Sequence, residues 1–154
     1  MSVRVQNEPF DVSAEIAKLT VDDTTIGAVA TFIGKVRGSA HGANLQSMTL
    51  EHYPGMTETE LQDIEHQAFA RFRLNASLIV HRVGDLKPGD DIVLVVTCSP
   101  HRQDAFQACE FLMDYLKTRA PFWKKETSVD GAGHWVDARA CDDTAADRWS
   151  KPSP

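Results

Sequence analysis

The sequence predicts an α+β domain built around a largely antiparallel sheet. The main observation is the order of the patterned segments, which after a short helix runs strand, strand, helix, strand, strand, helix, strand. The second is the length, because 154 residues can bury one proper core and leave too little chain for two. The third is a composition of 42% hydrophobic and 25% charged residues, which is ordinary for a globular protein. We therefore expect one domain over residues 1–154, with a frayed tail at 150–154.

The first half of the chain is expected to form a short helix, two strands joined by a loop, and a longer helix. Apolar residues of the first helix fall on one side, and the second strand alternates apolar with polar side chains. A capping box of Thr57 and Glu60 predicts where the longer helix begins. The segments are the helix 11–19, the strand 27–37, the flexible loop 38–44, the strand 45–53, and a helix with Leu61, Ile64, Ala68 and Phe72 on its apolar face.

The second half is expected to form two strands, a long helix and a last strand. The second of these strands is almost continuously apolar, so it should be central and covered on both faces. Ser99 is a good N-cap and Pro100 a good first residue for the helix, which must end before Pro121. Its inward stripe is expected to contain Ala105, Cys109, Leu112 and Leu116, with Phe106 and Met113 beside it. The other segments are the strand 76–84, the turn 84–90, the strand 91–99 and the last strand 134–140.

Charge and composition exclude several classes of function. A net charge of −6 opposes sequence-independent binding of nucleic acid. No apolar run approaches the ~20 residues that span a bilayer, and the N-terminus lacks the apolar region of a signal peptide. The three cysteines, at 98, 109 and 141, form no CxxC pair and suit a reducing compartment. We expect a cytoplasmic protein without membrane, metal or cofactor.

Two groups of basic residues flank the long helix. His101 and Arg102 stand at its start, where the helix dipole disfavours cations unless an anion binds among them. At its end lies a basic elbow, residues 114–126, in which an apolar Pro-Phe-Trp turn separates two pairs of cations. The alternative at the start is that both side chains point into water, and the alternative at the end is that the cations simply complement the dipole. The four cations of the elbow are Lys117, Arg119, Lys124 and Lys125.

The two basic groups cannot contact one small ligand within a single chain. Residues 101 and 117 are sixteen residues apart, or ~24 Å along a helix. Either the chain has two sites, or a symmetric dimer places the start of one helix against the end of another.

A third basic segment, Lys35 and Arg37, precedes a Gly-containing loop that could cradle phosphate or be an ordinary turn. His52, His81 and Arg82 fall at strand positions, where each could be a satisfied core or edge residue. No metal-binding or glycosidase pattern occurs. If the chain is an enzyme, its functional groups are the side chains of Lys, Arg and His, which act on an anionic substrate.

Five stretches together resemble one protein family. They are "FIGKVR", "LEHYPGM", "HRVGDLKPGD", "SPHRQDAF" and "MDYLKTRAPFWKKE", and they are similar to the catalytic (large) subunit of molybdopterin synthase, the MoaE family. The resemblance covers roughly residues 9–149, which we take as the core. It implies an α/β hammerhead-type domain with a small additional β subdomain.

The resemblance also implies an activity and partners. The family converts cyclic pyranopterin monophosphate (precursor Z) to the dithiolene molybdopterin by transferring two sulfurs. The sulfur arrives as a thiocarboxylate on the C-terminal Gly-Gly of a small ubiquitin-like subunit, MoaD. Two large subunits form a central homodimer with one small subunit at each end, a heterotetramer.

Matching motifs carry the family's functional residues onto this sequence. The two catalytic lysines fall on Lys117, where the thiocarboxylate arrives, and Lys124. His101 and Arg102 are expected to come from the partner chain. The other substrate-binding residues implied are Phe32, Lys35, Val36, Arg37, Lys125, Glu126 and Arg139. The alternative reading is a non-catalytic module whose basic elbow binds an anion or an acidic protein tail.

Overall fold

The computed structural model describes residues 2–40, 43–129, 131, 133–136 and 140–150. The helices are α1 (Val12–Thr20), α2 (Met56–Arg71), α3 (Arg102–Arg119) and α4 (Ala140–Asp147), which a 3-10 turn η1 (Arg148–Ser150) follows. The strands are β1 (Val3–Gln6), β2 (Ala28–Lys35), β3 (Ser39–Ala40), β4 (Ala43–His52), β5 (Ala76–Arg82), β6 (Gly84–Leu86), β7 (Asp91–Ser99), β8 (Phe122–Ser128) and β9 (Gly133–Val136).

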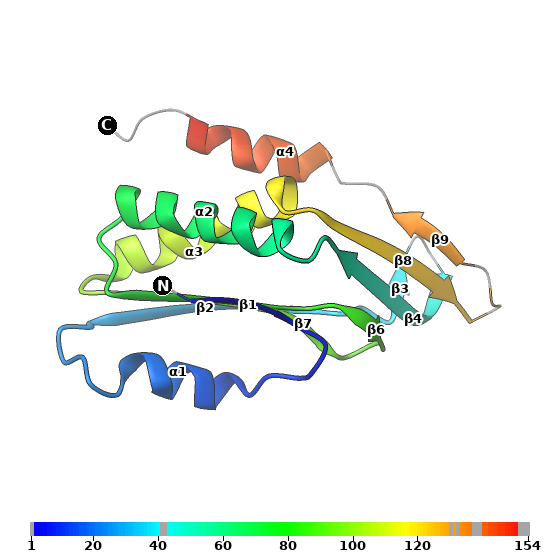
Figure 1. Cartoon of the computed structure of the whole chain (residues 1–154), viewed down its shortest axis with the longest axis horizontal. Coiled ribbons are helices and arrows are strands. Elements are labelled where there is room, and N and C mark those ends of the chain that lie inside the picture. The colour runs from blue at the N-terminus through cyan, green and yellow to red at the C-terminus, as the bar shows by residue number, and fades with distance from the viewer. Residues whose placement is uncertain (1, 41–42, 130, 132, 137–139, 151–154) are drawn as a thin grey trace.

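The main sheet has the strand order β1-β5-β7-β2, with only the β1–β5 pair parallel. Helix α1 covers one face, and α2 and α3 cover the other (Figure 1). The predicted central strand is confirmed, because β7 lies between β5 and β2 and is buried from Val93 to Ser99. Side chains of β7 alternate between the two faces, which is why its sequence is almost continuously apolar.

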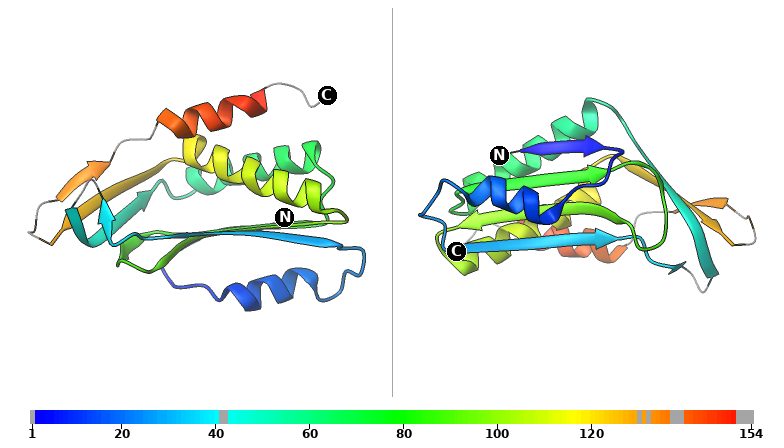
Figure 2. Two further views of the ribbon diagram at one scale, coloured as in Figure 1. Left: turned by 180° about the vertical axis from the view of Figure 1, so that it is seen from behind. Right: turned by 90° about the horizontal axis from the view of Figure 1, so that it is seen from below.

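A smaller sheet forms at one end of the main one. Its order is β3-β4-β8-β9, and β6 pairs with the free part of β4. Views from two further sides show this sheet extending past the ends of α2 and α3 (Figure 2). The expected α+β class, with a largely antiparallel main sheet and an additional β subdomain, is confirmed.

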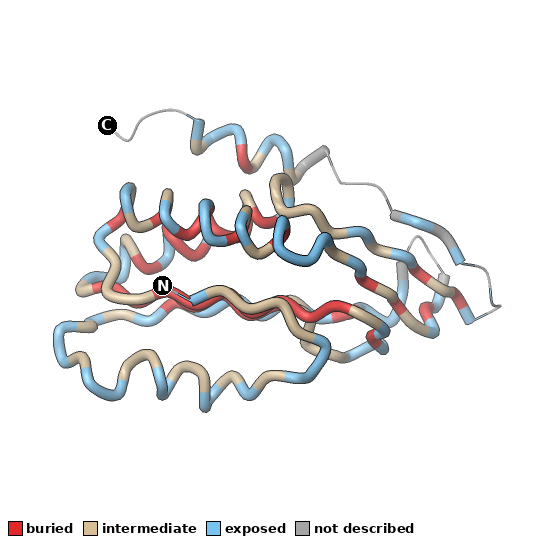
Figure 3. Tube along the Cα trace, in the orientation of Figure 1, coloured by how far each residue is buried: buried red, intermediate tan, exposed pale blue. Residues whose placement is uncertain are grey.

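The largest buried cluster lies between the main sheet and the helices α2 and α3, as the burial map shows (Figure 3). The apolar faces predicted for both helices are confirmed, with one exception. Phe106 on α3 is 66% exposed and points away from the core. The buried residues of these faces are Leu61, Ile64, Ala68, Phe72, Ala105, Cys109, Leu112, Met113 and Leu116.

The C-terminal segment packs back onto the helices. The ring of Trp149 in η1 makes edge-to-face contacts with Phe72 and Phe111. Its indole nitrogen donates a hydrogen bond to Asp114 on α3 at 2.7 Å. Helix α4 was not predicted, because its mixed sequence has a weak apolar face and its position depends on these distant contacts.

Within the described residues, the strand predictions were wrong in three places besides strand β8, which is described with the site. Strand β1 was missed, and it pairs with β5 before the segment that we took as the core. The predicted loop 38–44 contains β3 and the start of β4, and the predicted turn 84–90 begins with β6. The last strand, predicted over 134–140, is present as β9 over Gly133–Val136, and residues 137–139 of the prediction lie outside the described residues. The missed strands β1, β3 and β6 are two to four residues long, so hydrogen bonds to a partner strand decide them, and so short a segment carries little alternation.

Both long helices begin elsewhere than predicted. The capping box of Thr57 and Glu60 does not form, because α2 begins at Met56 and Glu58 accepts a hydrogen bond from the backbone of Gly55 at 2.6 Å. Helix α3 begins at Arg102, two residues after Pro100, with His101 as its N-cap. The hydroxyl of Ser99 instead donates to the Arg73 carbonyl at 2.8 Å, so a tertiary contact replaces the expected cap. The predicted end of α3 before Pro121 is confirmed.

Candidate functional site

The basic elbow joins the end of α3 to strand β8. Lys117 is exposed in the last turn of the helix, and the chain becomes extended at Ala120. Phe122 then opens β8, so the second pair of lysines belongs to a strand and not to the loop that we expected. Strand β8 pairs with β4 along seven residues, which fixes the direction of each of its side chains.

The two adjacent lysines of β8 point to opposite faces of the small sheet. Lys124 pairs with Leu50 in the register and is half-buried. Its ammonium lies 3.6 Å from the carboxylate of Glu126, which is buried on the same face. Lys125 is exposed on the other face, beside Trp123. Of the pair, only Lys124 therefore shares a face with Phe122 and the main body of the protein.

His81 packs against Phe122, the first residue of β8, and lies near the charge of Lys117. Its ring stacks on Phe122 with centroids 4.0 Å apart, and its Nδ1 lies 2.9 Å from the Arg82 carbonyl. The pKa of His81 is lowered to about 4, chiefly by burial, and the nearby charge of Lys117 contributes to this decrease. A carbonyl can only accept, so Nδ1 carries the proton and Nε2 of this neutral ring is an acceptor. The sequence does not decide whether His81 is a core or an edge residue, although a polar residue inside an apolar strand needs a hydrogen-bond partner.

The segment 35–37 lies at the same end of the main sheet. Lys35 ends β2 and forms an ion pair with Asp91 at the start of β7. Val36 is 4% exposed and packs in a cluster with Leu50, against which Phe122 also packs. Arg37 is exposed. Because one cluster contains Val36 and contacts Phe122, the segment 35–37 and the elbow are held in one fixed arrangement.

The start of α3 lies at the opposite end of the helix. His101 and Arg102 are exposed there, and the side chain of His101 caps no backbone group. The two residues line an open depression of about 550 Å³ together with Phe106, Gln103 and Gln107. The sixteen residues to Lys117 correspond to ~24 Å. One chain therefore brings Lys117, Lys124 and 35–37 to one end and leaves His101 and Arg102 at the other.

The remaining predicted site residues are placed as follows. Phe32 lies on β2, the edge strand of the main sheet, and is 39% exposed. Arg139 lies outside the described residues. Within the described ranges, no group of three or more His, Cys, Asp or Glu side chains could hold a metal ion. In the same ranges, no helix is long and apolar enough to cross a membrane.

The MoaE protein family model matches residues 5–119, from β1 to the end of α3. The chain belongs to the MoaE family. A molybdopterin synthase catalytic subunit of Rhizobium meliloti (strain 1021) is 53% identical over 152 residues, which are 98% of this chain and 97% of that one. Among solved structures, the molybdopterin biosynthesis MoaE protein from Burkholderia ambifaria MC40-6 matches with a TM-score of 0.83 and 51% identity, covering 97% and 98% of the two chains. Molybdopterin synthase from Staphylococcus aureus matches with a TM-score of 0.79 and 32% identity, covering 86% and 95%.

The resemblance seen in five stretches of sequence is therefore confirmed for this MoaE-family chain. The matched region contains four of those stretches and the first half of the fifth, which continues into β8. It also contains His81 and Arg82, two buried polar residues that we did not assign to the site. Both lie at the end of strand β5.

Proposed function

We propose that this chain is the catalytic subunit of a molybdopterin synthase. It would transfer sulfur from the thiocarboxylated C-terminus of a small ubiquitin-like subunit to cyclic pyranopterin monophosphate. The observation that carries the proposal is the convergence of Lys117, Lys124 and the basic segment 35–37 at one end of the fold. Relatives about 50% identical over nearly the whole chain are named as this subunit, which supports it.

In this proposal the lysines orient the incoming thiocarboxylate, stabilise developing negative charge and transfer protons. Arg37, Arg139 and the pair His101 and Arg102 hold the anionic pterin. The described cysteines are poor nucleophiles, because burial raises the pKa of Cys98 and raises that of Cys109 to about 11. The transferred sulfur then comes from the carrier subunit. As Cys98 and Cys109 are free thiols, we also propose a reducing, cytoplasmic location.

A homodimer would complete the site. Strand β2 is an edge strand, and three of its apolar side chains, Val29, Phe32 and Ile33, are exposed. Such an edge favours pairing with another chain. Helix α3 packs on β2, so a two-fold axis through the middle of β2 sets the start of one α3 beside the end of the other. We propose that His101 and Arg102 reach the lysines of the partner chain in this way, within a heterotetramer that carries one small subunit at each end.

The substitution Lys117→Ala tests the proposed activity. We expect molybdopterin formation from thiocarboxylated small subunit and precursor to fall by about 10²–10³-fold, the usual cost of losing one group that stabilises transition-state charge. The matched control is Lys18→Ala, which also removes an exposed lysine from the last turn of a helix, on the opposite face of the sheet. Near-wild-type product formation by Lys117→Ala would refute the proposal.

The same variant separates the proposal from a non-catalytic binding module. If the elbow only docks an acidic tail, Lys117→Ala weakens binding of the small subunit while turnover at saturation survives. If the elbow is catalytic, turnover stays low however much small subunit is added. Nucleic acid binding is a third possibility, which the net charge of −6 opposes, and a steep salt-dependent affinity for DNA or RNA would reveal it.

A further inference from the structure

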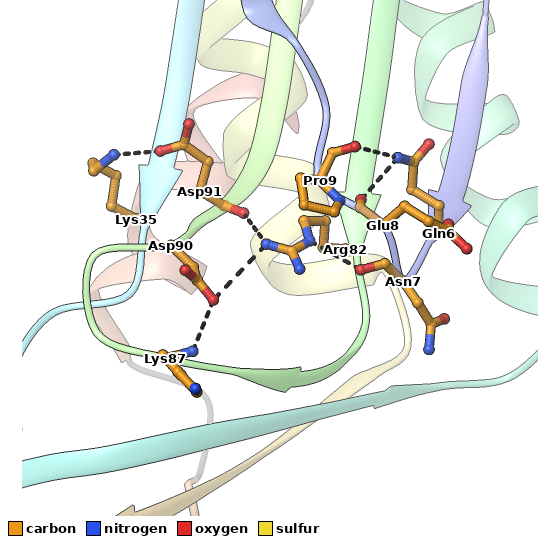
Figure 4. A network of polar contacts seen from close by, with 9 residues as sticks. All are labelled: Gln6, Asn7, Glu8, Pro9, Lys35, Arg82, Lys87, Asp90 and Asp91. Carbon is orange, nitrogen blue, oxygen red and sulfur yellow. Dashed lines mark hydrogen bonds and ion pairs between the residues drawn. The ribbon is translucent and has the colours of Figure 1, made fainter.

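Arg82 is a buried cation that the proposed reaction does not use. It ends β5, is 9% exposed, and extends its guanidinium between three segments of the chain (Figure 4). Its Nε donates to the carbonyl of Asn7 at 3.1 Å, and its Nη1 donates to the carbonyl of Asp91 at 3.2 Å. The same Nη1 lies 3.9 Å from a carboxylate oxygen of Asp90. Arg82 thus holds the segment after β1 against the turn that leads into β7.

That turn, residues 87–91, is internally bonded. The backbone N–H of Lys87 donates to the Asp90 carboxylate at 2.9 Å, and the N–H of Asp90 donates to the Lys87 carbonyl at 3.0 Å. Gly89 has a φ of 91°, a conformation that side chains disfavour. Arg82 therefore contacts a turn of defined shape through two consecutive residues, Asp90 and Asp91.

The turn 87–91 also holds the segment 35–37. The N–H of Val36 donates to the Asp90 carbonyl at 2.9 Å, and the N–H of Gly89 donates to the Val36 carbonyl at 2.8 Å. The Asp91 carboxylate forms the ion pair with Lys35. Three residues of the turn thus fix two consecutive residues before Arg37. An arginine suits the centre of this arrangement, because its rigid fork of donors serves separate acceptors at once.

We propose that Arg82 is a positioning residue for the substrate-binding segment 35–37, acting through the turn 87–91. The inference rests on the proposed function, in which Arg37 binds the anionic pterin. Arg82 itself does not contact the substrate. It sets the place from which Arg37 reaches it, and the carrier tail, which arrives at Lys117, does not depend on it.

The test compares Arg82→Met with Lys87→Met. Both remove one positive charge at the same turn, but the Lys87 side chain is exposed and this residue takes part through its backbone. For Arg82→Met we expect KM for cyclic pyranopterin monophosphate to rise about tenfold, because small misplacements of binding groups are costly. We expect kcat per folded protein to change less than about twofold, and KM for the thiocarboxylated subunit to stay unchanged. Lys87→Met should leave all three constants near wild type.

A loss of folded protein alone would lower the apparent kcat and leave both KM values unchanged, which would overturn the proposal. An equal rise in both KM values would also overturn it. If Arg82→Met does not accumulate as folded protein, Arg82→Lys replaces it, since lysine keeps the charge and lacks the fork. The same rise in KM for the pterin is expected.

Amide hydrogen exchange without substrate separates this inference from the proposed function. In Arg82→Met the amides of Val36 and Gly89 should exchange at least about tenfold faster, while that of Leu94 in the central strand keeps its rate. Unchanged exchange at Val36 and Gly89 would overturn the positioning role whatever the enzyme makes. The amides of Val36 and Gly89 could exchange faster in Arg82→Met while the wild-type protein forms no molybdopterin. In that case the proposed function fails, but the link from Arg82 to the segment 35–37 stands.

Discussion

His81 shows how one buried side chain makes the stability of this protein depend on pH. The unfolded chain binds a proton at this residue near the ordinary pKa of 6.5, whereas the folded chain binds it only near a pKa of about 4. Between these values the unfolded state holds more protons than the folded state. Stability contributed by the neutral ring is therefore present above pH 6.5 and is lost as the pH falls toward 4.

We predict that His81→Asn removes most of this dependence. The asparagine amide can still donate to the Arg82 carbonyl, but it does not titrate. The wild-type free energy of unfolding should fall by about 2 kcal/mol more than that of the variant between pH 7 and pH 5, as measured by urea denaturation. The control His66→Asn replaces an exposed histidine on α2 and should keep the wild-type slope. Parallel profiles for His81→Asn and wild type would contradict the prediction.

At the scale of the secondary-structure elements, Thr57 links the end of β4, the start of α2 and the basic elbow. It lies in the first turn of α2 and is fully buried. Its hydroxyl donates to the Pro121 carbonyl and accepts from the backbone N–H of Tyr53, both at 3.0 Å. Pro121 is the second of the two residues between α3 and β8. One hydroxyl thus fastens the end of β4 and the start of α2 to the elbow between the two lysines.

The substitution Thr57→Val should cost about 2 kcal/mol of unfolding free energy. Valine keeps the shape but leaves two part-buried backbone groups without this partner. Thr59→Val, two positions further along on the exposed side of the same turn, is the control and should change stability by less than about 0.5 kcal/mol. Chemical denaturation compares the two, and equal losses would show that the bond to Pro121 contributes nothing.

The elements that the sequence predicted well are those whose buried residues recur at a regular spacing along the chain. Strand β7 and the inner faces of α2 and α3 are of this kind. Strand β8 was not predicted, because Pro121 and two adjacent lysines are typical of a loop. Its pairing with β4 is decided by residues about seventy positions away in the sequence. The start of α3 was misplaced for a similar reason. Gly27 approaches Pro100 so closely that a Cβ would lie 2.2 Å from its carbonyl oxygen, and no local pattern contains that contact.

The site divides in the same way. Lys117, Lys124 and Arg37 could be proposed from motifs, because chemistry restricts which residue types stand there. His81 and Arg82 could not be assigned a role, since each acquires one from contacts across the fold. Arg82 depends on the carbonyls of Asn7 and Asp91, which belong to other segments of the chain.

At the scale of the whole molecule, the two ends of α3 must meet across a dimer for the proposed site to be complete. This arrangement makes a prediction about mixtures of inactive chains. Lys117→Ala and Arg102→Ala should each be inactive, because each removes one component from every site. A mixed dimer, however, contains one site with both components intact and one that lacks both.

Refolding the two variants together in equal amounts should therefore restore about a quarter of wild-type activity, since half of the dimers are mixed and half of their sites are intact. Molybdopterin formation before and after co-refolding is the measurement. Each variant refolded alone is the control. Activity that stays at the level of the separate variants would show that both residues act within one chain.

In such a dimer, the length of α3 also sets the separation of the two active centres. Its eighteen residues span about 27 Å, so the helix acts as a spacer that matches the separation of two active centres. Inserting or deleting one residue within it would rotate everything beyond that point by about 100° and shift it by about 1.5 Å. Both centres would be misaligned together, although the core around the change could repack. The number of residues in this helix is thus constrained by the assembly of the proposed dimer rather than by the single chain.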